Sequence, residues 1–254
     1  MATWVDSHCH LFSLDEDPGS VLDRAQAAGV KWVIVPGIDL DTSLAARAIA
    51  SAEPARAIWS AGLHPHDAAK WLVEGGRIEA LAAEAAAIGE CGLDFYRNLA
   101  PRQAQLDAFR AQLALAADLE KPVIIHCRDA FADVYAELEA AQLGQGAVLH
   151  CWTGGPKWTK RFRELGVTFS YAGPVTFEGG DTVRLGAAHA PLDRTMVETD
   201  TPYLTPPPDR RALNEPANVP RIGQALAEVW GVEVAAVAAS STATATRVFG
   251  GPSE

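Results

Sequence analysis

Ala2-Thr3-Trp4-Val5-Asp6-Ser7-His8-Cys9-His10 is a short apolar run that ends in two alternating histidines. Side chains at i and i+2 of a strand share one face, so His8 and His10 are predicted to project together, with Cys9 opposite. Two neutral imidazoles at the end of a strand suit a divalent metal such as zinc or manganese. Two ligands do not make a site, however, and a pair of histidines without a ligand also fits this stretch.

Apolar, β-branched runs alternate with helical segments along the whole chain. The helical signals include a capping box from Ser20 to Asp23, Pro101 as a first helical residue, and apolar residues at i, i+3, i+4 and i+7 over 131–138. The predicted strands are residues 2–6, 31–36, 57–62, 86–91, 122–127, 146–151, 167–172 and 195–199.

This alternation predicts an α/β fold with a parallel sheet. Eight units and 254 residues favour a single (β/α)8 barrel of the TIM type. An open doubly wound sheet is the competing architecture, but it usually carries a glycine-rich phosphate loop, and neither GxGxxG nor GxxxxGKS/T occurs here. No linker or repeat divides the sequence, so residues 1–254 are predicted to form one domain.

The composition is that of an ordinary globular protein, with 48% hydrophobic and 21% charged residues. No apolar stretch is long enough for a membrane span and the N-terminus lacks a signal-peptide layout, so a cytoplasmic protein without an obligate protein partner is expected. The net charge of −11 does not support a basic nucleic-acid-binding protein. A metal-dependent enzyme acting on phosphodiesters stays compatible with it, because bound cations reverse the local field.

The four cysteines show no CxxC spacing, and each follows one of four polar residues at a predicted strand end. The residue after an inward-facing ligand faces outward, where a small apolar thiol packs well beneath the helices. We therefore predict packing roles for Cys9, Cys91, Cys127 and Cys151.

Polar residues gather at the predicted carboxyl ends of the strands, where a barrel places its active site. Of the seven histidines, only His189 lies elsewhere. Taken together, the strand-end residues predict a metal site. Its proposed ligands are His8, His10, Glu90, His126, His150 and Asp200.

Six ligands exceed what one tetrahedral metal needs, which suggests two divalent cations (Mg, Mn or Zn). A carboxylate can bridge two cations, and two metals about 3.5–4 Å apart can share an activated water that attacks phosphorus in line. A carboxylate beside them can handle the proton of that water.

Eight motifs along nearly the whole chain resemble the TatD-like deoxyribonucleases, metal-dependent hydrolases with an amidohydrolase-type barrel. Their order in the sequence also matches the family. The motifs are DSHCHL (6–11), GLHPHDA (62–68), IGECGLDFY (88–96), PVIIHCRDA (122–130), LHCWTGG (149–155), VETDTPYLTP (197–206), RALNEPANVP (211–220) and TRVFG (246–250).

The resemblance implies one metal held by His8, His10, Glu90 and Asp200, and another held by Glu90, His126 and His150. It also implies a 3′-to-5′ exonuclease, with single-stranded DNA or 3′ ends as substrate. We therefore expect Glu90 to bridge the metals, and Asp200 to orient the attacking water and move its proton.

Two alternatives stay open. One is a barrel metallohydrolase acting on an aminoacyl-tRNA ester or a small molecule, since one scaffold hosts many chemistries. Many binuclear relatives bridge their metals with a modified lysine, whereas Glu90 holds the strand-4 position and Lys121 precedes strand 5, which favours the nuclease. The other is a non-enzymatic scaffold that keeps metals for stability.

Further side chains are predicted to contact substrate or to support the site. His64 and His66 are predicted to contact a phosphate, although His64-Pro65 also suits loop shaping, and Arg128 is predicted either to grip a phosphate or to pair with a carboxylate. Tyr203 and Trp152 are candidates for stacking on a base, although aromatics in such loops more often serve as lids or packing. Asp94 is expected behind a ligand histidine, and Glu215 to orient a ligand or its loop. Thr244 replaces an asparagine usual in the family, at a packing or capping position.

Gly155-Pro156 is predicted to begin the helix after the sixth strand. Lys157, Lys160 and Arg161 share one side of it, and the first two oppose the helix dipole. A solvated charged face is one interpretation. The other is that this face follows the phosphates of a strand whose end lies at the metals.

Overall fold

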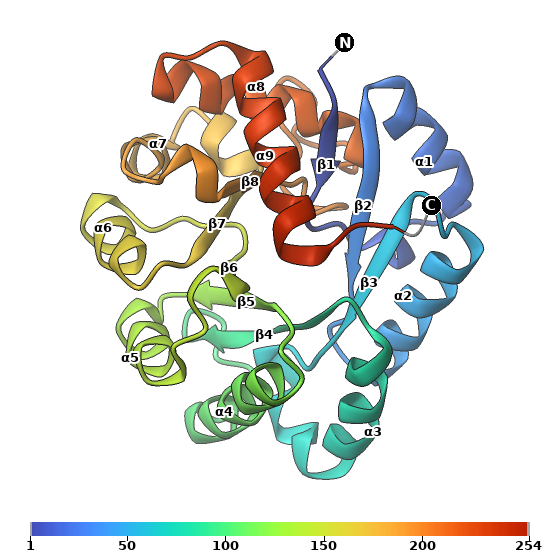
Figure 1. The fold of residues 1–254 in the computed structure, drawn as a ribbon, viewed down its shortest axis with the longest axis vertical. Helices are drawn as coiled ribbons and strands as arrows, with labels where there is room; N and C mark the ends of the chain where they lie inside the picture. The colour runs from blue at the N-terminus through green and yellow to red at the C-terminus, as the bar shows by residue number, and fades with distance from the viewer. Residues whose placement is uncertain (1, 253–254) are drawn as a thin grey trace.

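Eight parallel strands form an inner ring and helices surround it in the computed structural model, which describes residues 2–252 (Figure 1). Neighbours in the sheet follow chain order from β1 to β8, so the predicted barrel is confirmed and the open doubly wound sheet is excluded. The strands are β1 (Trp4–Asp6), β2 (Val30–Pro36), β3 (Ala57–Ala61), β4 (Ala87–Asp94), β5 (Val123–Arg128), β6 (Ala147–Leu149), β7 (Thr168–Tyr171) and β8 (Thr195–Val197).

Helices connect the strands and form the outer layer (Figure 1). The α-helices are α1 (Pro18–Ala27), α2 (Leu40–Ala52), α3 (Trp71–Glu84), α4 (Arg102–Asp118), α5 (Phe131–Ala141), α6 (Pro156–Glu164), α7 (Asp181–Ala187), α8 (Val219–Trp230) and α9 (Val234–Phe249). The short 3₁₀ helices are η1 (Leu11–Ser13), η2 (Pro65–Lys70), η3 (Gly144–Gly146), η4 (Gly173–Thr176), η5 (Leu192–Arg194) and η6 (Pro216–Asn218).

Helix starts follow the sequence signals in part. Pro156 begins α6 as predicted, and Pro101 is the residue just before α4 rather than its first helical residue. The predicted capping box from Ser20 to Asp23 is wrong. The side chain of Asp17 caps α1 by accepting a hydrogen bond from the N–H of Ser20 at 2.9 Å, so the helix starts earlier.

The ring closes where the segments after β8 and β1 run side by side. The N–H of Ser7 donates to the carbonyl of Val197 at 3.1 Å, and Cys9 forms a parallel bridge with Thr201 beyond the ends of the two strands. These segments carry three of the predicted metal ligands, so closure of the barrel brings together residues that are almost two hundred positions apart.

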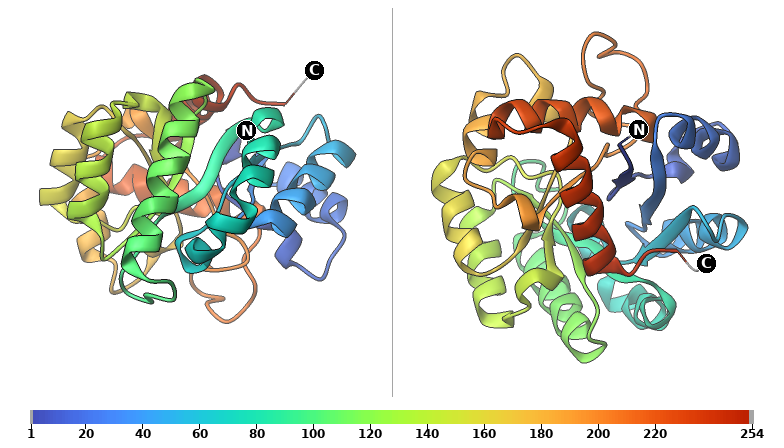
Figure 2. Two further views of the ribbon diagram at one scale, coloured as in Figure 1. Left: turned by 90° about the horizontal axis from the view of Figure 1, so that it is seen from below. Right: turned by 45° about the horizontal axis from the view of Figure 1, so that its top comes forward.

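The interior of the ring is apolar at the amino-terminal ends of the strands. Val5, Ile34, Ile124 and Met196 cluster there with Phe249 of α9. Helix α9 lies across the ring in Figures 1 and 2, and it covers the amino-terminal mouth. Burying these side chains leaves the opposite, carboxyl-terminal mouth as the open face of the barrel.

Thr244 fixes the position of α9. Its buried hydroxyl donates to the carbonyl of Asp193, in the turn that directly precedes β8, at 3.1 Å. The residue that departs from the family pattern is therefore a packing contact at the barrel floor, as predicted.

No single helix among residues 2–252 is long and apolar enough to cross a membrane. Pro216–Trp230 and Val234–Phe249 pass that test only as a pair, and they are bent by 111° at their junction.

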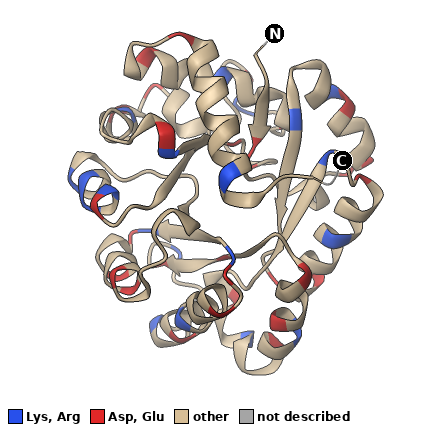
Figure 3. Cartoon of the chain, in the orientation of Figure 1, with Lys and Arg blue, Asp and Glu red and all other residues tan. Residues whose placement is uncertain are grey.

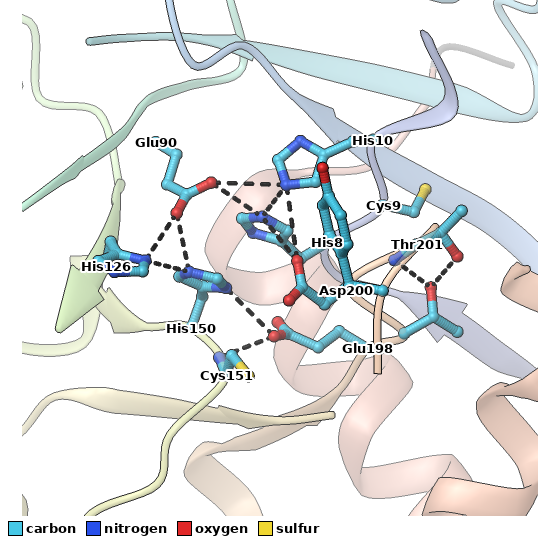
Figure 4. Close-up of polar contacts among 12 residues, drawn as sticks. His8, Cys9, His10, Glu90, His126, His150, Cys151, Glu198, Asp200 and Thr201 are labelled. Carbon is cyan, nitrogen blue, oxygen red and sulfur yellow. Dashed lines mark hydrogen bonds and ion pairs between the residues drawn. The ribbon is translucent and has the colours of Figure 1, made fainter. Parts of the chain in front are cut away.

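Three cysteines fit the predicted packing role. Cys9 and Cys91 are fully buried in the layer between strands and helices, and Cys127 packs against it. Cys151 is half-buried and lies beside Glu198 instead (Figure 4). Within the described residues all four thiols are free, and none belongs to a group of possible metal ligands.

Candidate metal centre

The open face of the barrel brings together all six side chains predicted as metal ligands (Figure 4). They come from the ends of five strands, and parallel strands in a barrel deliver their carboxyl ends to one face. Figure 4 shows His8, His10, Glu90, His126, His150 and Asp200 pointing toward one another.

One group of donor atoms surrounds Oε2 of Glu90. Nε2 of His8 lies 3.2 Å from Nε2 of His10 and 3.2 Å from Oε2 of Glu90. Nε2 of His10 lies 3.6 Å from the same oxygen and 3.5 Å from Oδ1 of Asp200. Ligand atoms of a tetrahedral zinc site are separated by about 3.3–3.6 Å, so this group has the spacing of a metal site.

A second group surrounds the other oxygen of Glu90. Oε1 lies 2.9 Å from Nε2 of His150 and 3.1 Å from Nδ1 of His126. Nε2 of His64 lies 3.4 Å from the same oxygen, so this imidazole also borders the second group. Glu90 thus stands between two sets of donors, with one oxygen facing each.

Two glycines allow Glu90 to reach this position. Gly89 and Gly92 have φ angles of +117° and +132°, which side chains rarely adopt. A Cβ at Gly89 would lie 2.5 Å from the carbonyl oxygen of Ile124, and one at Gly92 would lie 2.0 Å from that of His126. The IGECG motif therefore lets β4 approach β5 closely enough for Glu90 to meet His126.

The carboxylates of the centre are ionised. Burial raises the pKa of Glu90, but the positive charge of His150 and the contacts with the neighbouring imidazoles outweigh it and hold that pKa well below its usual range. Burial likewise raises the pKa of Asp200, and the hydrogen bond with His10 reverses the shift. Burial lowers the pKa of His64 to about 4, so this imidazole is neutral at pH 7.

Two buried nitrogen atoms of the centre remain without partners within residues 2–252. Nδ1 of His8 and Nδ1 of His10 have no hydrogen-bond partner among the described residues. Their Nε2 atoms face each other at 3.2 Å, where two neutral imidazoles can share at most one proton. A concentration of imidazole lone pairs and carboxylate oxygens of this kind fits divalent cations.

Asp94 supports the second group from behind, as the sequence predicted. Its Oδ2 lies 3.3 Å from Nε2 of His126, whose other nitrogen faces Glu90. The same oxygen lies 2.8 Å from Nε2 of His66. His66 is therefore a partner of Asp94. A phosphate bound by Nε2 of His66, as the sequence predicted, would have to replace this carboxylate.

Glu198 was missed as a site residue by the sequence reasoning. Its Oε1 lies 3.3 Å from Nδ1 of His150 and accepts the N–H of Cys151 at 2.7 Å, while its Oε2 accepts the hydroxyl of Ser170 at 2.5 Å. A carboxylate behind an imidazole fixes the tautomer and orientation of the ring. The signal was present in the sequence, because Glu198 stands two residues before Asp200 in a buried strand motif.

The loop after β8 is held by Asn214. Its Nδ2 donates to the carbonyls of Thr199 and Tyr203, at 2.8 and 2.7 Å, on either side of Asp200. Glu215 forms an ion pair with Arg24 of α1 at 2.6 Å. Glu215 therefore anchors the loop to the outer layer and contacts none of the predicted ligands.

The two aromatic predictions have different outcomes. Tyr203 is exposed, with its ring centroid 6.4 Å from that of His10, at the entrance to the centre. Trp152 is buried, and its indole N–H donates to Thr159 of α6. Of the two interpretations offered for Trp152, packing is therefore the correct one: the ring packs α6 onto the barrel.

The predicted basic residues are accessible. Arg128 is exposed and its Cζ lies 4.1 Å from the ring centroid of Tyr96. Lys157 is exposed at the start of α6 and lies over the ring of Trp158, 5.5 Å from its centroid. Among residues 2–252 neither cation is within ion-pair distance of a carboxylate, so the predicted alternative of an Arg128–carboxylate pair is wrong.

Comparison with known families agrees with this geometry. The profile of a family described as TatD related DNase matches residues 5–250. The chain belongs to this family. It is 41% identical over 247 residues to the 3′-5′ ssDNA/RNA exonuclease TatD of Citrobacter rodentium, covering 92% of both chains. It is also 36% identical over 252 residues to the uncharacterized metal-dependent hydrolase YcfH of Escherichia coli, covering 96% of this chain and 95% of that one.

Solved structures of the TatD family share the barrel. The TatD homolog YjjV of Escherichia coli superimposes with a TM-score of 0.91 at 25% identity, over 99% of both chains. A TatD family hydrolase from Entamoeba histolytica, 19% identical, has the same fold with a TM-score of 0.86 over 98% of this chain and 99% of that one. The predicted family, fold and enzyme class, a metal-dependent hydrolase, are confirmed.

Proposed function

We propose that this TatD family protein is a 3′-to-5′ exonuclease that hydrolyses phosphodiester bonds of single-stranded DNA. The observation that carries the proposal is the position of Glu90, whose two oxygens each face a separate set of imidazoles. Two cations sharing one carboxylate form a centre suited to in-line displacement at phosphorus. The name of the Citrobacter relative, a 3′-5′ ssDNA/RNA exonuclease, supports the choice of substrate.

Two divalent cations fit the donor sets of this proposal. His8, His10, Asp200 and Oε2 of Glu90 would hold one cation. Oε1 of Glu90, His126 and His150 would hold the other. When bound, such cations lower the pKa of water and neutralise charge on the phosphate. Four imidazoles favour Zn²⁺ or Mn²⁺ over Mg²⁺, which prefers oxygen ligands.

Asp200 is the residue we assign to proton transfer. Its side chain is 15% exposed, against 3% for Glu90, so it borders the space that substrate enters. The ionised carboxylate accepts the proton of the attacking water as the new P–O bond forms and the bond from phosphorus to the 3′ oxygen breaks. It then returns that proton to the departing oxygen, which leaves as a 3′ hydroxyl. Asp94 and Glu198 hold the rings of His126 and His150 during this step.

The substrate contacts are proposed from position and charge. His64 borders the second donor set, where a neutral imidazole can donate to a phosphate oxygen. Arg128, Tyr203 and Lys157 are exposed on the same face of the barrel and would bind the strand outside the centre. His66 would act on the site mainly by holding Asp94, which in turn supports the ring of His126.

Turnover of 5′-end-labelled single-stranded DNA, measured against a panel of Mg²⁺, Mn²⁺ and Zn²⁺, tests the proposal. We expect a ladder of labelled fragments that shorten from the 3′ end, and complete loss of activity after chelation. Full activity in a sample shown by elemental analysis to be metal-free would contradict the binuclear centre. Hydrolysis of an aminoacyl-tRNA ester or a small ester with no cleavage of DNA would favour the other barrel hydrolases.

The exposed side of α6, where Figure 3 shows basic residues along the helix, gives a separate prediction. Lys157, Lys160 and Arg161 are exposed, and Arg161 lies 4.4 Å from the ring centroid of Tyr135 and 5.0 Å from that of Trp158. We expect their combined change to Gln to weaken binding of single-stranded DNA. The log–log dependence of affinity on salt should flatten by about 0.7 for each phosphate that the variant no longer binds.

Affinity titrations at several salt concentrations measure this slope. Arg47→Gln, which removes an exposed cation paired with Glu84 on the outer surface, serves as the control. An unaltered slope in the triple variant would mean that these side chains are a solvated face that binds no phosphate.

A further inference from the structure

Exposed apolar side chains gather at the same end of the barrel as the metal centre. Nine large ones are exposed among residues 2–252, and six of these lie between the carboxyl end of a strand and the first turn of the following helix. A concentration of exposed apolar surface at one face marks a place that a ligand or partner covers. The six are Leu72, Val73, Tyr96, Leu99, Tyr203 and Leu213.

One of the six forms a stacked pair with a cation. Tyr96 is 63% exposed, and the guanidinium of Arg128 lies over its ring at 4.1 Å from the centroid. Among residues 2–252, Arg128 has no carboxylate within ion-pair distance. A guanidinium stacked on a ring keeps its in-plane N–H groups free to donate, and they match a phosphate in geometry and charge.

Strands β4 and β5 connect this pair directly to the metal centre. Arg128 is the register partner of Asp94, and its carbonyl accepts the N–H of Phe95, the residue before Tyr96, at 2.9 Å. Arg128 also follows His126 by two residues, so both side chains project from the same face of β5. The stacked pair therefore stands beside the donor set that contains His126.

We propose that Tyr96 and Arg128 form a nucleotide-binding subsite, in which Tyr96 stacks on a base and Arg128 binds the adjacent phosphate. The inference rests on the proposed function and specifies where the strand leaves the centre. A nucleotide offers an apolar face and an anion side by side, which is what the stacked pair presents. An apolar protein surface placed here would bury the charge of Arg128 without an acceptor, which is costly.

Binding of an abasic series tests the subsite. Each oligothymidine carries a 5′ fluorophore, phosphorothioate linkages at its 3′ end to slow hydrolysis, and one abasic position. Fluorescence anisotropy with the metal-loaded protein should show one position at which base removal weakens binding by about 5- to 100-fold. Tyr96→Ala should weaken binding of the intact oligothymidine by a similar factor and abolish the penalty at that position. Tyr96→Phe should preserve it.

Charge is tested in the same assay. Arg128→Gln should flatten the salt dependence by about 0.7 in log–log slope, the value for one phosphate contact. Arg110→Gln makes the same charge change at an exposed residue of α4 that pairs with Glu137, and should leave affinity and slope unchanged. Tyr96→Ala that binds as tightly as the wild type, or that keeps the abasic penalty, would overturn the subsite.

The failure of the subsite and that of the proposed function are distinguishable. If the wild type degrades single-stranded DNA but the variants behave as the wild type, only the subsite falls. If the wild type neither binds nor cleaves single-stranded DNA, the proposed function fails and the subsite with it. A change of Tyr96 that converts a dimer to a monomer in sedimentation, with the abasic penalty intact, would assign the patch to self-association instead.

Discussion

Replacing Glu90 with alanine is expected to remove metal from both halves of the centre and to reduce turnover more than about 10³-fold. The physical reason is that Oε1 and Oε2 face different donor sets, so one substitution deletes a ligand from each. Because metal is lost as well, the decrease should lie in or above the upper part of the roughly 10²–10⁴-fold range that a general base alone contributes. Elemental analysis and end-labelled DNA turnover measure the two effects together.

Glu90→Gln separates the ligand effect from the cavity that alanine leaves, because the amide keeps the shape of the buried side chain. It should lose metal as well, since an amide is a weaker ligand than a carboxylate. Glu84→Ala, on the exposed end of α3, is the control for loss of an acidic residue. A Glu90→Ala protein with wild-type metal content and turnover would refute the shared carboxylate.

Asp200→Asn is expected to reduce kcat by about 10²–10⁴-fold while changing affinity for single-stranded DNA far less. The amide preserves the shape of the side chain but cannot accept the proton of the attacking water at neutral pH. In the wild type, His10 holds the pKa of Asp200 low against the effect of burial, so the base is ionised and ready. Steady-state turnover and anisotropy titrations give the two quantities.

Asp209→Asn, in the exposed part of the same loop, controls for an acid-to-amide change near the site. A loss of turnover below about tenfold in Asp200→Asn, with metal content intact, would reduce Asp200 to a ligand without a role in proton transfer.

The barrel was predictable from the sequence because its signals are local and repeated. Each strand is a short apolar run, and a helical segment follows it, so the class of fold depends on periodicity rather than on any single residue. All eight predicted strands are present. The predicted ends of helices were less accurate where a side-chain hydrogen bond, rather than the apolar periodicity, sets the first residue. At α1 the carboxylate of Asp17 captures the N–H of Ser20 and moves the helix start.

The six proposed ligands were predictable because parallel strands deliver their carboxyl ends to one face. A residue at a strand end is therefore placed by topology before any coordinate is known. Glu198 and the Tyr96–Arg128 pair were not found in this way. Their roles depend on which side chain each residue meets from another strand, such as His150 for Glu198 and Arg128 for Tyr96. The choice between stacking and packing for Trp152 stayed open for the same reason, since its burial under α6 is a packing outcome.

The sequence by itself determined the family, the barrel and the set of residues at its open face, because these follow from strand periodicity and from motifs of adjacent residues. Only the tertiary structure decided how the ligand atoms divide between the two oxygens of Glu90. That Oε2 of Glu90 faces His8 while Oε1 faces His150 depends on the twist of β4 between two glycines, and on closure of β8 against β1. Distances of a few ångströms between strands far apart in the chain arise from packing, and local sequence carries no record of them.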